Sequence, residues 1–276
     1  AISIVYIITY FDWKHNILPF SEEEEHEYRK LLCGKLGLDY FAFKSCDVII
    51  CISKSVANDI SQSISSKLND KILLLPNGVD VSRFDSVKYD HPKKRIPRTV
   101  NIGYTGVIKP FYGIEEMIDA IIIIYDSDFE ILLNIYGDGP ILGDLKEKYS
   151  SKPAIVFHGP KPSDEIPYLL KSMDILVYTS SIRNKYQSPI KIYEYMASKT
   201  PIVSMITPQT LQLMGNNDRG LLYHEGNKEE LIECFQKLIN DSSLGQSLAK
   251  RAYDEVLANH TWTHRINKLN GYIDKK

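Results

Sequence analysis

Long apolar runs and an excess of either charge are missing from this sequence of 276 residues. No stretch reaches the roughly 18 apolar residues that a membrane-spanning helix needs. Lys and Arg total 33 against 35 Asp and Glu, which gives a net charge of −2. A nucleic-acid-binding protein needs a basic surface that such a balance does not supply. We therefore expect neither a transmembrane protein nor a partner of nucleic acid.

Cysteine, glycine and proline are scarce as well. The four cysteines form no CxxC pair, and Cys234 lies far in sequence from Cys33, Cys46 and Cys51. This pattern argues against a disulfide framework or a zinc site, and it favours reduced thiols in a cytoplasmic protein. The 15 Gly and 13 Pro are too few for a collagen-like or disordered chain. We predict a globular protein without a metal site.

Strand and helix patterns alternate along the chain, as is typical of α/β proteins with parallel sheets. Residues 85–98 combine charge with two prolines and show no apolar periodicity, which indicates a linker. We predict a partial domain over residues 1–84, a second α/β domain over residues 85–258 and a closing helical segment over residues 259–276. The opening apolar run, residues 1–11, indicates a core strand and not a signal peptide.

The same patterns predict the individual elements. Strands are expected near residues 1–11, 47–52, 71–75, 100–104, 129–136, 154–157, 175–178, 202–205 and 220–223. Helices are expected near residues 53–66, 113–125, 141–149, 164–171, 189–198, 228–240, 244–258 and 262–273. Because parallel α/β sheets bind ligands at the carboxyl ends of their strands, the loops that follow those strands are the first place to look for a site.

Two of these loops are rich in glycine. The first, Gly103–Gly106, is followed by Lys109, and it suits either a phosphate or a plain tight turn. The second, Tyr136–Pro140, does not match a dinucleotide fingerprint, because the next glycine is Gly143 and no acidic residue ends the next strand. NAD binding is therefore not expected. The motif of a P-loop is missing, which excludes that class.

The junction that begins at Ser188 contains the largest number of residues suited to binding a ligand. Ser188 is a suitable helix N-cap and Pro189 a suitable first helical residue. The free N–H groups of such a helix start attract anions, and Lys191, with Arg183 just upstream, adds charge for a diphosphate. Glu194 follows on a largely apolar helix. It either accepts hydrogen bonds from sugar hydroxyls or pairs with Lys191 at i,i+3, and both interpretations stay open.

Several short motifs then follow one another in a recognisable order: Leu75–Asp80 with Arg83 and Phe84, Gly106, Tyr136–Pro140, Phe157–Pro160, Met173–Val177, Ser188–Ala197, Pro201–Val203 and Gly220–Leu222. This series resembles the family 4 retaining glycosyltransferases of the GT-B fold. The resemblance implies an α/β protein with two Rossmann-like parallel-sheet domains. The first is incomplete, since only its second half is matched, around Asp47–Ser53. Trp262 and the last helix resemble the family's segment that crosses back to the first domain.

The resemblance also implies a donor site for a nucleotide-diphosphate sugar. Glu194 matches the glutamate that holds the ribose hydroxyls, Gly106 and the helix start at Pro189 would meet the diphosphate, and His158–Lys161 would lie against the base. The full set of candidate donor-binding residues is Gly106, Lys109, Gly137, His158, Gly159, Lys161, Arg183, Ser188, Pro189, Ile190, Lys191 and Glu194. Glu194 is also a catalytic candidate.

The chain departs from the family pattern in its charged residues. The first glutamate of the E-x7-E motif falls at Tyr186, and the family's Arg and Lys after the glycine turn fall at Val107 and Tyr112. Neutralisation of a phosphate would then come from Lys109, Arg183 or Lys191.

The family's catalytic-side histidine has no match either. Asp12 stands near its place, and we interpret Asp12 either as a catalytic candidate facing the donor or as an exposed loop residue.

The resemblance implies transfer of a hexose from a UDP- or GDP-sugar to a glycan or lipid-linked acceptor, with no metal or other cofactor. The alternative is a catalytically incomplete nucleotide-sugar-binding half of a split transferase, completed by a partner chain or by self-association. A GT-B epimerase or phosphorylase fits the segment Ser188–Ala197 less well. We expect a cytoplasmic protein, and peripheral association with the inner face of the membrane stays open.

Overall fold

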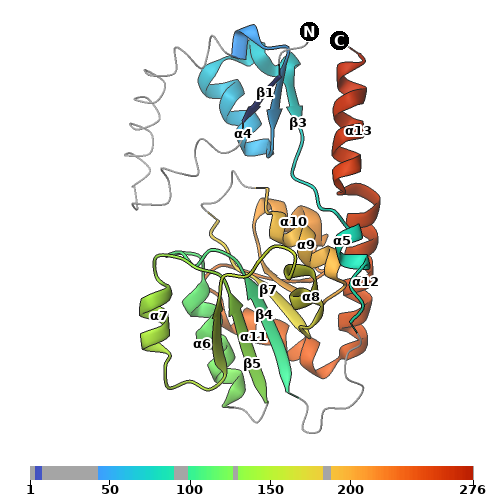
Figure 1. Ribbon diagram of the computed structural model, residues 1–276. Coiled ribbons are helices and arrows are strands. Elements are labelled where there is room, and N and C mark those ends of the chain that lie inside the picture. Colours follow the sequence, from blue (N-terminus) through green and yellow to red (C-terminus); the bar gives the residue numbers. More distant parts are fainter. Residues whose placement is uncertain (1–3, 8–42, 90–98, 127–129, 183–187, 276) are drawn as a thin grey trace. The chain divides into compact units, whose positions relative to one another are not determined.

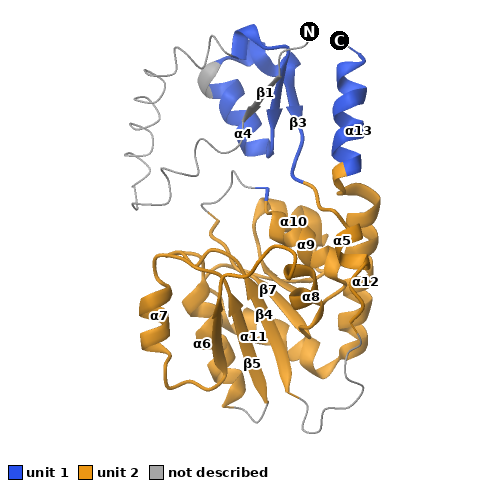
Figure 2. Cartoon of the chain, in the orientation of Figure 1, with its two compact units in different colours: residues 1–77, 185–188, 263–276 blue, residues 78–184, 189–262 orange. Residues whose placement is uncertain are grey.

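A computed structural model describes residues 4–7, 43–89, 99–126, 130–182 and 188–275 (Figure 1). The chain forms two compact units (Figure 2). Unit 1 comprises Ala1–Asn77, Lys185–Ser188 and Thr263–Lys276, and unit 2 comprises Gly78–Asn184 and Pro189–Trp262.

Unit 1 contains a parallel sheet of three strands in the order β1-β2-β3: β1 (Ile4–Ile7), β2 (Val48–Cys51) and β3 (Ile72–Leu74). The helix α4 (Lys54–Asp59) begins at Ser53, whose Oγ accepts a hydrogen bond from the backbone of Val56 at 3.3 Å. One π-helical turn (Ile60–Ile64) and one 3-10 turn (Ser66–Lys71) follow. The last helix, α13 (Trp262–Ile273), packs Leu269 and Tyr272 against Ile50 and Leu73.

Unit 2 is a doubly wound α/β domain with six parallel strands in the order β6-β5-β4-β7-β8-β9. The strands are β4 (Val100–Thr105), β5 (Ile131–Tyr136), β6 (Ile155–Gly159), β7 (Ile175–Tyr178), β8 (Ile202–Met205) and β9 (Leu221–Tyr223). The chain winds outward from β4 to one side and then from β7 to the other. The crevice of such a sheet opens at the carboxyl ends of the two strands where the winding reverses, here β4 and β7.

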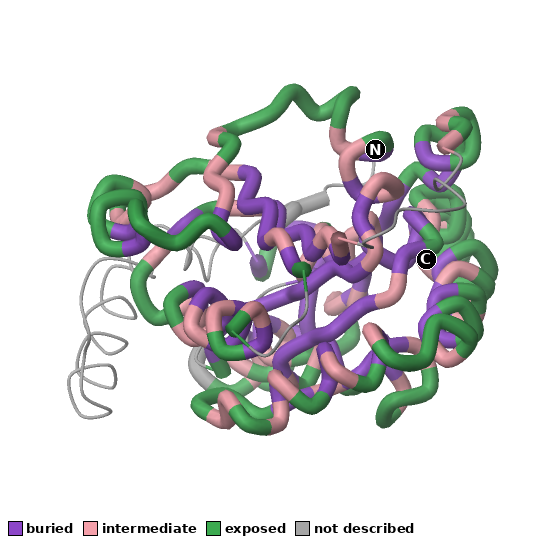
Figure 3. Tube along the Cα trace, turned by 90° about the horizontal axis from the view of Figure 1, so that it is seen from below, coloured by how far each residue is buried: buried purple, intermediate pink, exposed green. Residues whose placement is uncertain are grey.

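Helices cover both faces of this sheet. On one face, α6 (Ile114–Tyr125), α7 (Leu142–Lys148) and α11 (Lys228–Asn240) share a core with the side chains of β4 and β5. On the other, α8 (Ile166–Lys171), α9 (Ile190–Ser198), α10 (Pro208–Met214) and α12 (Ser242–Asn259) pack on β7 and β8, with the short helix α5 (Ser82–Asp85). Buried residues follow the strands, and exposed residues follow the outer sides of the helices and loops (Figure 3).

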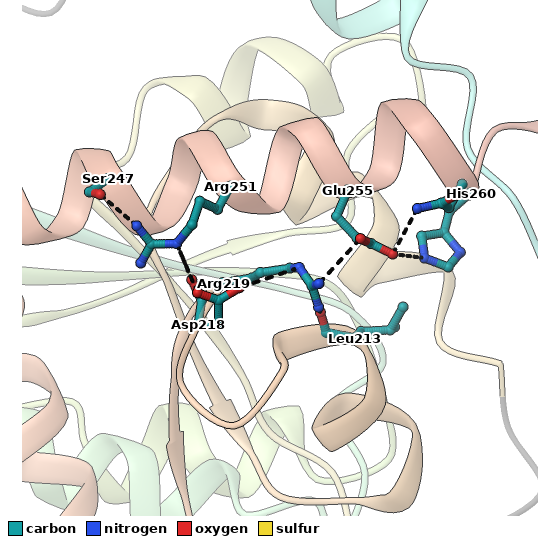
Figure 4. A network of polar contacts seen from close by, with 8 residues as sticks. Leu213, Asp218, Arg219, Ser247, Arg251, Glu255 and His260 are labelled. Carbon is teal, nitrogen blue, oxygen red and sulfur yellow. Dashed lines mark hydrogen bonds and ion pairs between the residues drawn. The ribbon is translucent and has the colours of Figure 1, made fainter.

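The loop between α10 and β9 is fastened to α12 by two arginines (Figure 4). Arg251 Nε donates to the carbonyl oxygen of Asp218 at 2.6 Å, and Arg219 Nη2 lies 3.3 Å from Glu255 Oε2. The other oxygen of Glu255 lies 3.0 Å from Nε2 of His260. These polar contacts hold the outer edge of the sheet against its longest helix.

The predicted parallel α/β architecture is confirmed, and so are the strands and helices that fall on described residues. Two helices were missed, the short α5 and α10. α10 begins with a capping box between Thr207 and Thr210 and ends at Gly215, whose φ is +60°. The three described cysteines, Cys46, Cys51 and Cys234, are free and buried. None of the helices in the described ranges is both long enough and apolar enough to cross a membrane.

Candidate functional site

The loops that leave β4, β5 and β6 are joined by main-chain hydrogen bonds. Gly106 N donates to the carbonyl of Tyr136 at 2.8 Å, and Gly137 N donates to the carbonyl of Gly159 at 2.9 Å. The ladder of the sheet therefore continues past the ends of the strands. Main-chain hydrogen bonds therefore join the loops at the carboxyl edge of the sheet, which we call the glycine floor.

Glycine is required for this close approach. A Cβ on Gly137 would lie 1.8 Å from the carbonyl oxygen of Gly106, and one on Gly139 would lie 2.0 Å from that of Ile108. Gly106 and Gly137 also have φ angles of +147° and +149°, which side chains rarely adopt. Ile108 N donates to the carbonyl of Asp138 at 2.8 Å, which extends the ladder by one more bond. These glycines therefore allow the backbones of the two loops to pack directly against each other.

Lys191 brings a positive charge to this floor. It lies in the first turn of α9, and its ammonium rests on Gly106, where a Cβ would be 1.5 Å from Nζ. The ring centroid of Tyr104 is 5.4 Å away. Burial lowers the pKa of Lys191 to about 8; the charge of Glu194 raises it and that of Lys109 lowers it. A cation this poorly solvated favours the arrival of an anion.

The N-cap residue of α9 gives no side-chain hydrogen bond to the start of the helix. Pro189 occupies the N-cap position with no side-chain hydrogen bond, so the prediction that Ser188 caps this helix is wrong. Ser188 Oγ instead accepts from the backbone N–H of Asn77 at 2.9 Å, and Asn77 Nδ2 donates to the Ser188 carbonyl at 2.8 Å. An uncapped helix start is a binding site for negative charge. Its first residue, Ile190, is 46% exposed.

Glu194 lies one turn further along α9 and is half-buried. Burial raises the pKa of its carboxyl, while the charges of Arg83 and then Lys191 lower it. Among the described residues, no ion pair joins Glu194 to Lys191 within 4.0 Å. The simple i,i+3 pair is therefore not formed, and the carboxylate oxygens stay available as acceptors.

Two residues that the sequence interpretation gave no role in the site support this part of α9. Tyr195 is fully buried, and its hydroxyl accepts from the backbone N–H of Thr105 at 2.9 Å, which joins α9 to the end of β4. Arg83, on α5, is the group whose charge acts most strongly on Glu194. The hydrogen bond between Tyr195 and Thr105 joins residues 90 positions apart, so no local pattern could have indicated it.

The candidate base-facing segment follows β6. The ring of His158 stacks on Tyr136 with centroids 4.4 Å apart, and its Nε2 lies 2.9 Å from Oδ1 of Asn134. Burial, and then the charge of Lys161, lowers the pKa of His158, which favours the neutral form of the imidazole. This segment presents a flat aromatic pair beside a free cation.

The structure thus brings most of the predicted donor-binding residues to one edge of unit 2. Lys109 lies over the ring of Tyr112, 5.8 Å from its centroid. Gly106, Gly137 and Gly159 form the floor described above. Arg183 and Asp12 lie outside the described residues, and their roles stay predictions. In the part of the chain that the structure describes, no three His, Cys, Asp or Glu side chains gather as a metal site.

Fold and site together define a class. The two parallel α/β units have the GT-B fold, as the comparison with solved structures below shows. The carboxyl edge of the unit 2 sheet brings together the glycine floor, the start of α9 and the half-buried Lys191. Sequence comparison then gives the family. Residues 99–241 match the family described as Glycosyl transferases group 1, and the chain belongs to it. The predicted α/β fold class and membership of a glycosyltransferase family are confirmed. The assignment to the family 4 retaining enzymes stays a prediction.

Two curated relatives show the range of this family. The capsular polysaccharide biosynthesis glycosyltransferase CapM of Staphylococcus aureus is 24% identical over 240 residues, which cover 82% of this chain and 62% of CapM. The alpha-monoglucosyldiacylglycerol synthase of Streptococcus pneumoniae is 22% identical over 220 residues, which cover 75% of this chain and 48% of that protein. The chain therefore spans about half to three fifths of these relatives.

Solved structures share the fold at low identity. Anabaena Alr3699/HepE, in complex with UDP and glucose, has a TM-score of 0.73 and 15% identity, covering 99% of this chain and 71% of that one. S. aureus TarM, in complex with fondaparinux, alpha-GlcNAc-glycerol and UDP, has a TM-score of 0.69 and 15% identity, covering 93% of this chain and 48% of that one.

Proposed function

We propose that this chain binds the donor of a retaining, family 4 type glycosyltransferase reaction, in which a hexose moves from a nucleotide-diphosphate sugar to a glycan or lipid-linked acceptor. The observation that carries the proposal is the Lys191 ammonium resting on Gly106 beside the uncapped start of α9. In this proposal, a diphosphate binds where Lys191, the first N–H groups of α9 and the backbone of Gly106 lie close together.

Each part of the donor has a proposed partner. The diphosphate lies on Gly106 and Gly137 and meets the N–H groups at Pro189 and Ile190, with Lys191 and Lys109 as cations. Glu194 accepts hydrogen bonds from the ribose hydroxyls. UDP and glucose in HepE, and UDP in TarM, support a nucleotide-sugar donor, and the base here is uracil or guanine.

The segment from His158 to Lys161 lies against the base in this proposal. The stacked pair of His158 and Tyr136 supplies an apolar face for a planar ring, and the neutral imidazole adds no charge there. Sugar transfer would then depend on positioning and on stabilising the departing diphosphate, since the helix start and Lys191 both attract the negative charge that develops on it.

The acceptor class is proposed from the relatives. CapM is named for capsular polysaccharide and the pneumococcal synthase for a glucosyldiacylglycerol, so we propose a glycan or a lipid-linked glycan. A cytoplasmic protein that works at the inner face of the membrane would meet such an acceptor. Unit 1, with α13, is proposed as the acceptor-side part of the GT-B fold, and unit 2 as the donor-binding part.

A second function is favoured by the sheet of unit 1. Among its described strands, β1 pairs on one side only, with β2, and an open sheet edge can pair with another chain. The chain would then be the nucleotide-sugar-binding half of a split transferase, completed by a partner or by self-association. Transfer activity that arises only after a partner chain is added would favour this alternative, and full activity of the monomer would exclude it.

Calorimetric titration with UDP, GDP and their common hexose conjugates tests the donor site. We expect one conjugate to bind, and Glu194→Ala to weaken it about 10- to 100-fold, as the loss of hydrogen bonds to a charged group implies. Glu147→Ala, on the exposed face of α7, is the matched control and should bind like the wild type. Undiminished binding to Glu194→Ala would refute the role assigned to Glu194.

A further inference from the structure

Asn77 is the last residue of unit 1 before the chain enters unit 2, and its carbonyl group and the segment that follows it are bonded to other parts of the chain. Nε of the buried Arg265, from α13, donates to the Asn77 carbonyl oxygen at 3.0 Å. Val79, two positions further on, pairs with Thr261 in a parallel bridge just before α13. The backbone of Asn77 is therefore fixed, and its side chain extends from a defined position.

Asn77 and Ser188 form reciprocal hydrogen bonds. The backbone N–H of Asn77 donates to Ser188 Oγ at 2.9 Å, and Asn77 Nδ2 donates to the Ser188 carbonyl oxygen at 2.8 Å. Each side chain therefore bonds the main chain of the other residue, so both the hydroxyl and the peptide group of Ser188 are held. Because Ser188 is buried, the loss of either bond would leave a polar group there without its partner.

Ser188 directly precedes the start of α9. Its neighbour Pro189 is the N-cap residue and gives no side-chain hydrogen bond to the helix. A capping side chain commonly fixes a helix start. In α9 the bonds from Asn77 to the residue in front of the cap take that place. Lys191 follows Ser188 by only three positions, so a shift of Ser188 would displace the groups that we propose for the diphosphate.

We propose that Asn77 is a positioning residue of the donor site, whose two hydrogen bonds to Ser188 hold the start of α9 in the orientation that binds a diphosphate. The inference rests on the proposed function, because it takes the start of α9 as part of the diphosphate site. Asn77 does not touch the nucleotide and acts through Ser188 alone. The role therefore concerns the phosphates and not the base or the ribose.

Separate titrations with the nucleoside diphosphate that the wild-type chain binds and with its nucleoside, uridine or guanosine, test this role. Asn77→Ala removes the bond to the Ser188 carbonyl, so the start of α9 loses its alignment with the diphosphate. We expect the affinity for the nucleoside diphosphate to fall about 10-fold, as for weakened hydrogen bonds to a charged group. The nucleoside carries no phosphate, so its affinity should change less than about 2-fold.

Ser188→Ala removes the other bond and should weaken binding of the diphosphate by a similar factor. Since both substitutions break one pair of reciprocal bonds, we expect the double variant to bind little more weakly than either single variant. Effects that multiply in the double variant would overturn the inference. So would an equal loss for the diphosphate and the nucleoside in Asn77→Ala, or unchanged affinity for both. If Asn77→Ala does not fold, Asn77→Ser, whose shorter side chain stays polar, replaces it.

Thr200→Ala is the matched control. The buried Thr200 lies just beyond the carboxyl end of the same helix, and its hydroxyl donates to the carbonyl oxygen of Leu170 at 3.0 Å. The variant therefore loses a bond of the same kind at the far end of α9, and it should bind both ligands like the wild type. A loss of diphosphate affinity as large as that of Asn77→Ala would also overturn the inference.

The two proposals fail in different ways. If the wild-type chain binds no nucleoside diphosphate, the proposed donor site is wrong and the inference falls with it. If it binds one, and Glu194→Ala weakens binding while Asn77→Ala does not, the donor site stands and only the role of Asn77 is refuted.

Discussion

Lys191 stands where a helix ordinarily prefers an acidic residue. A cation in the first turn opposes the helix dipole, and the nearby charge of Lys109 adds repulsion. Burial costs the ammonium further solvation. Three unfavourable effects at one side chain are relieved together by a diphosphate. The position of Lys191 is therefore better explained by ligand binding than by a contribution to the stability of the fold.

This lysine predicts an alkaline limit for binding. Its pKa is about 8, so the ammonium is lost as the pH rises above that value, and affinity for a nucleoside diphosphate should fall from pH 7 to pH 9.5. Lys191→Arg should bind equally well at both pH values, because arginine stays charged. Calorimetry at the two pH values measures this.

Lys191→Met should bind the nucleoside diphosphate weakly at both pH values, and its affinity should not fall further from pH 7 to pH 9.5. Lys146→Met, at an exposed position of α7, is the matched control and should retain the wild-type fall. An alkaline fall of wild-type size in Lys191→Met would contradict the assignment.

At the scale of elements, the floor of the site is a continuation of the sheet by main chain alone. The bond from Gly137 N to the Gly159 carbonyl lies beyond the regular ladder, which shifts register between Ile135 and Tyr136. The glycines that permit this are part of the fold as much as of the site. Replacing these glycines should therefore lower the free energy of unfolding of the ligand-free protein.

Two glycine substitutions separate these effects. Gly137→Ala forces a Cβ to within 1.8 Å of the Gly106 carbonyl, so we expect the free energy of unfolding to fall by about 2–4 kcal/mol. Gly143→Ala, on α7, meets nothing within 4 Å and should stabilise the protein by about 0.5–1 kcal/mol. Denaturant titration of both measures the difference. Equal stability of the two variants would contradict the described floor.

Features of these elements that depend on neighbouring residues could be predicted from the sequence. Features that depend on contacts between residues far apart in the sequence could not. Buried strands such as β7 and β8 follow from their apolar runs, and their predicted ends were correct. The prediction that Ser188 caps α9 was wrong, because its hydroxyl oxygen accepts a hydrogen bond from the backbone N–H of Asn77, 111 positions away. Arg83 was noted only as part of a motif, since its acceptor, Ser163, lies 80 positions further on. Local patterns predict elements, and the remote contacts that tune the site come only with the fold.

At the scale of the whole molecule, Asn77 and Ser188 belong to unit 1, and the other described residues proposed for the donor site belong to unit 2. The glycine floor, Lys109, Lys191 and Glu194 are all part of unit 2. Unit 1 has its own sheet and its own small cores around Ile49 and Ile50. Binding of a nucleotide alone should therefore act mainly on unit 2.

Hydrogen exchange of the whole protein tests this division. With a saturating nucleoside diphosphate, we expect slower exchange of backbone amides at residues 106–109, 136–139 and 190–194, because the ligand covers them or restricts their opening. Amides of β1, β2 and β3 should exchange as in the free protein. Slowing of equal size in both units would show that the described residues are not the whole of the nucleotide site.

The glycine floor has a consequence for how this site can change over generations. At Gly106, Gly137 and Gly139 every other side chain meets the same backbone or lysine atoms, so all replacements there are penalised alike, whatever their polarity. Val107, which is 46% exposed in the same loop, carries no such restriction. Evolution or design can therefore change the exposed side chains of this loop, while the glycine backbone that we propose for phosphate binding has to stay the same.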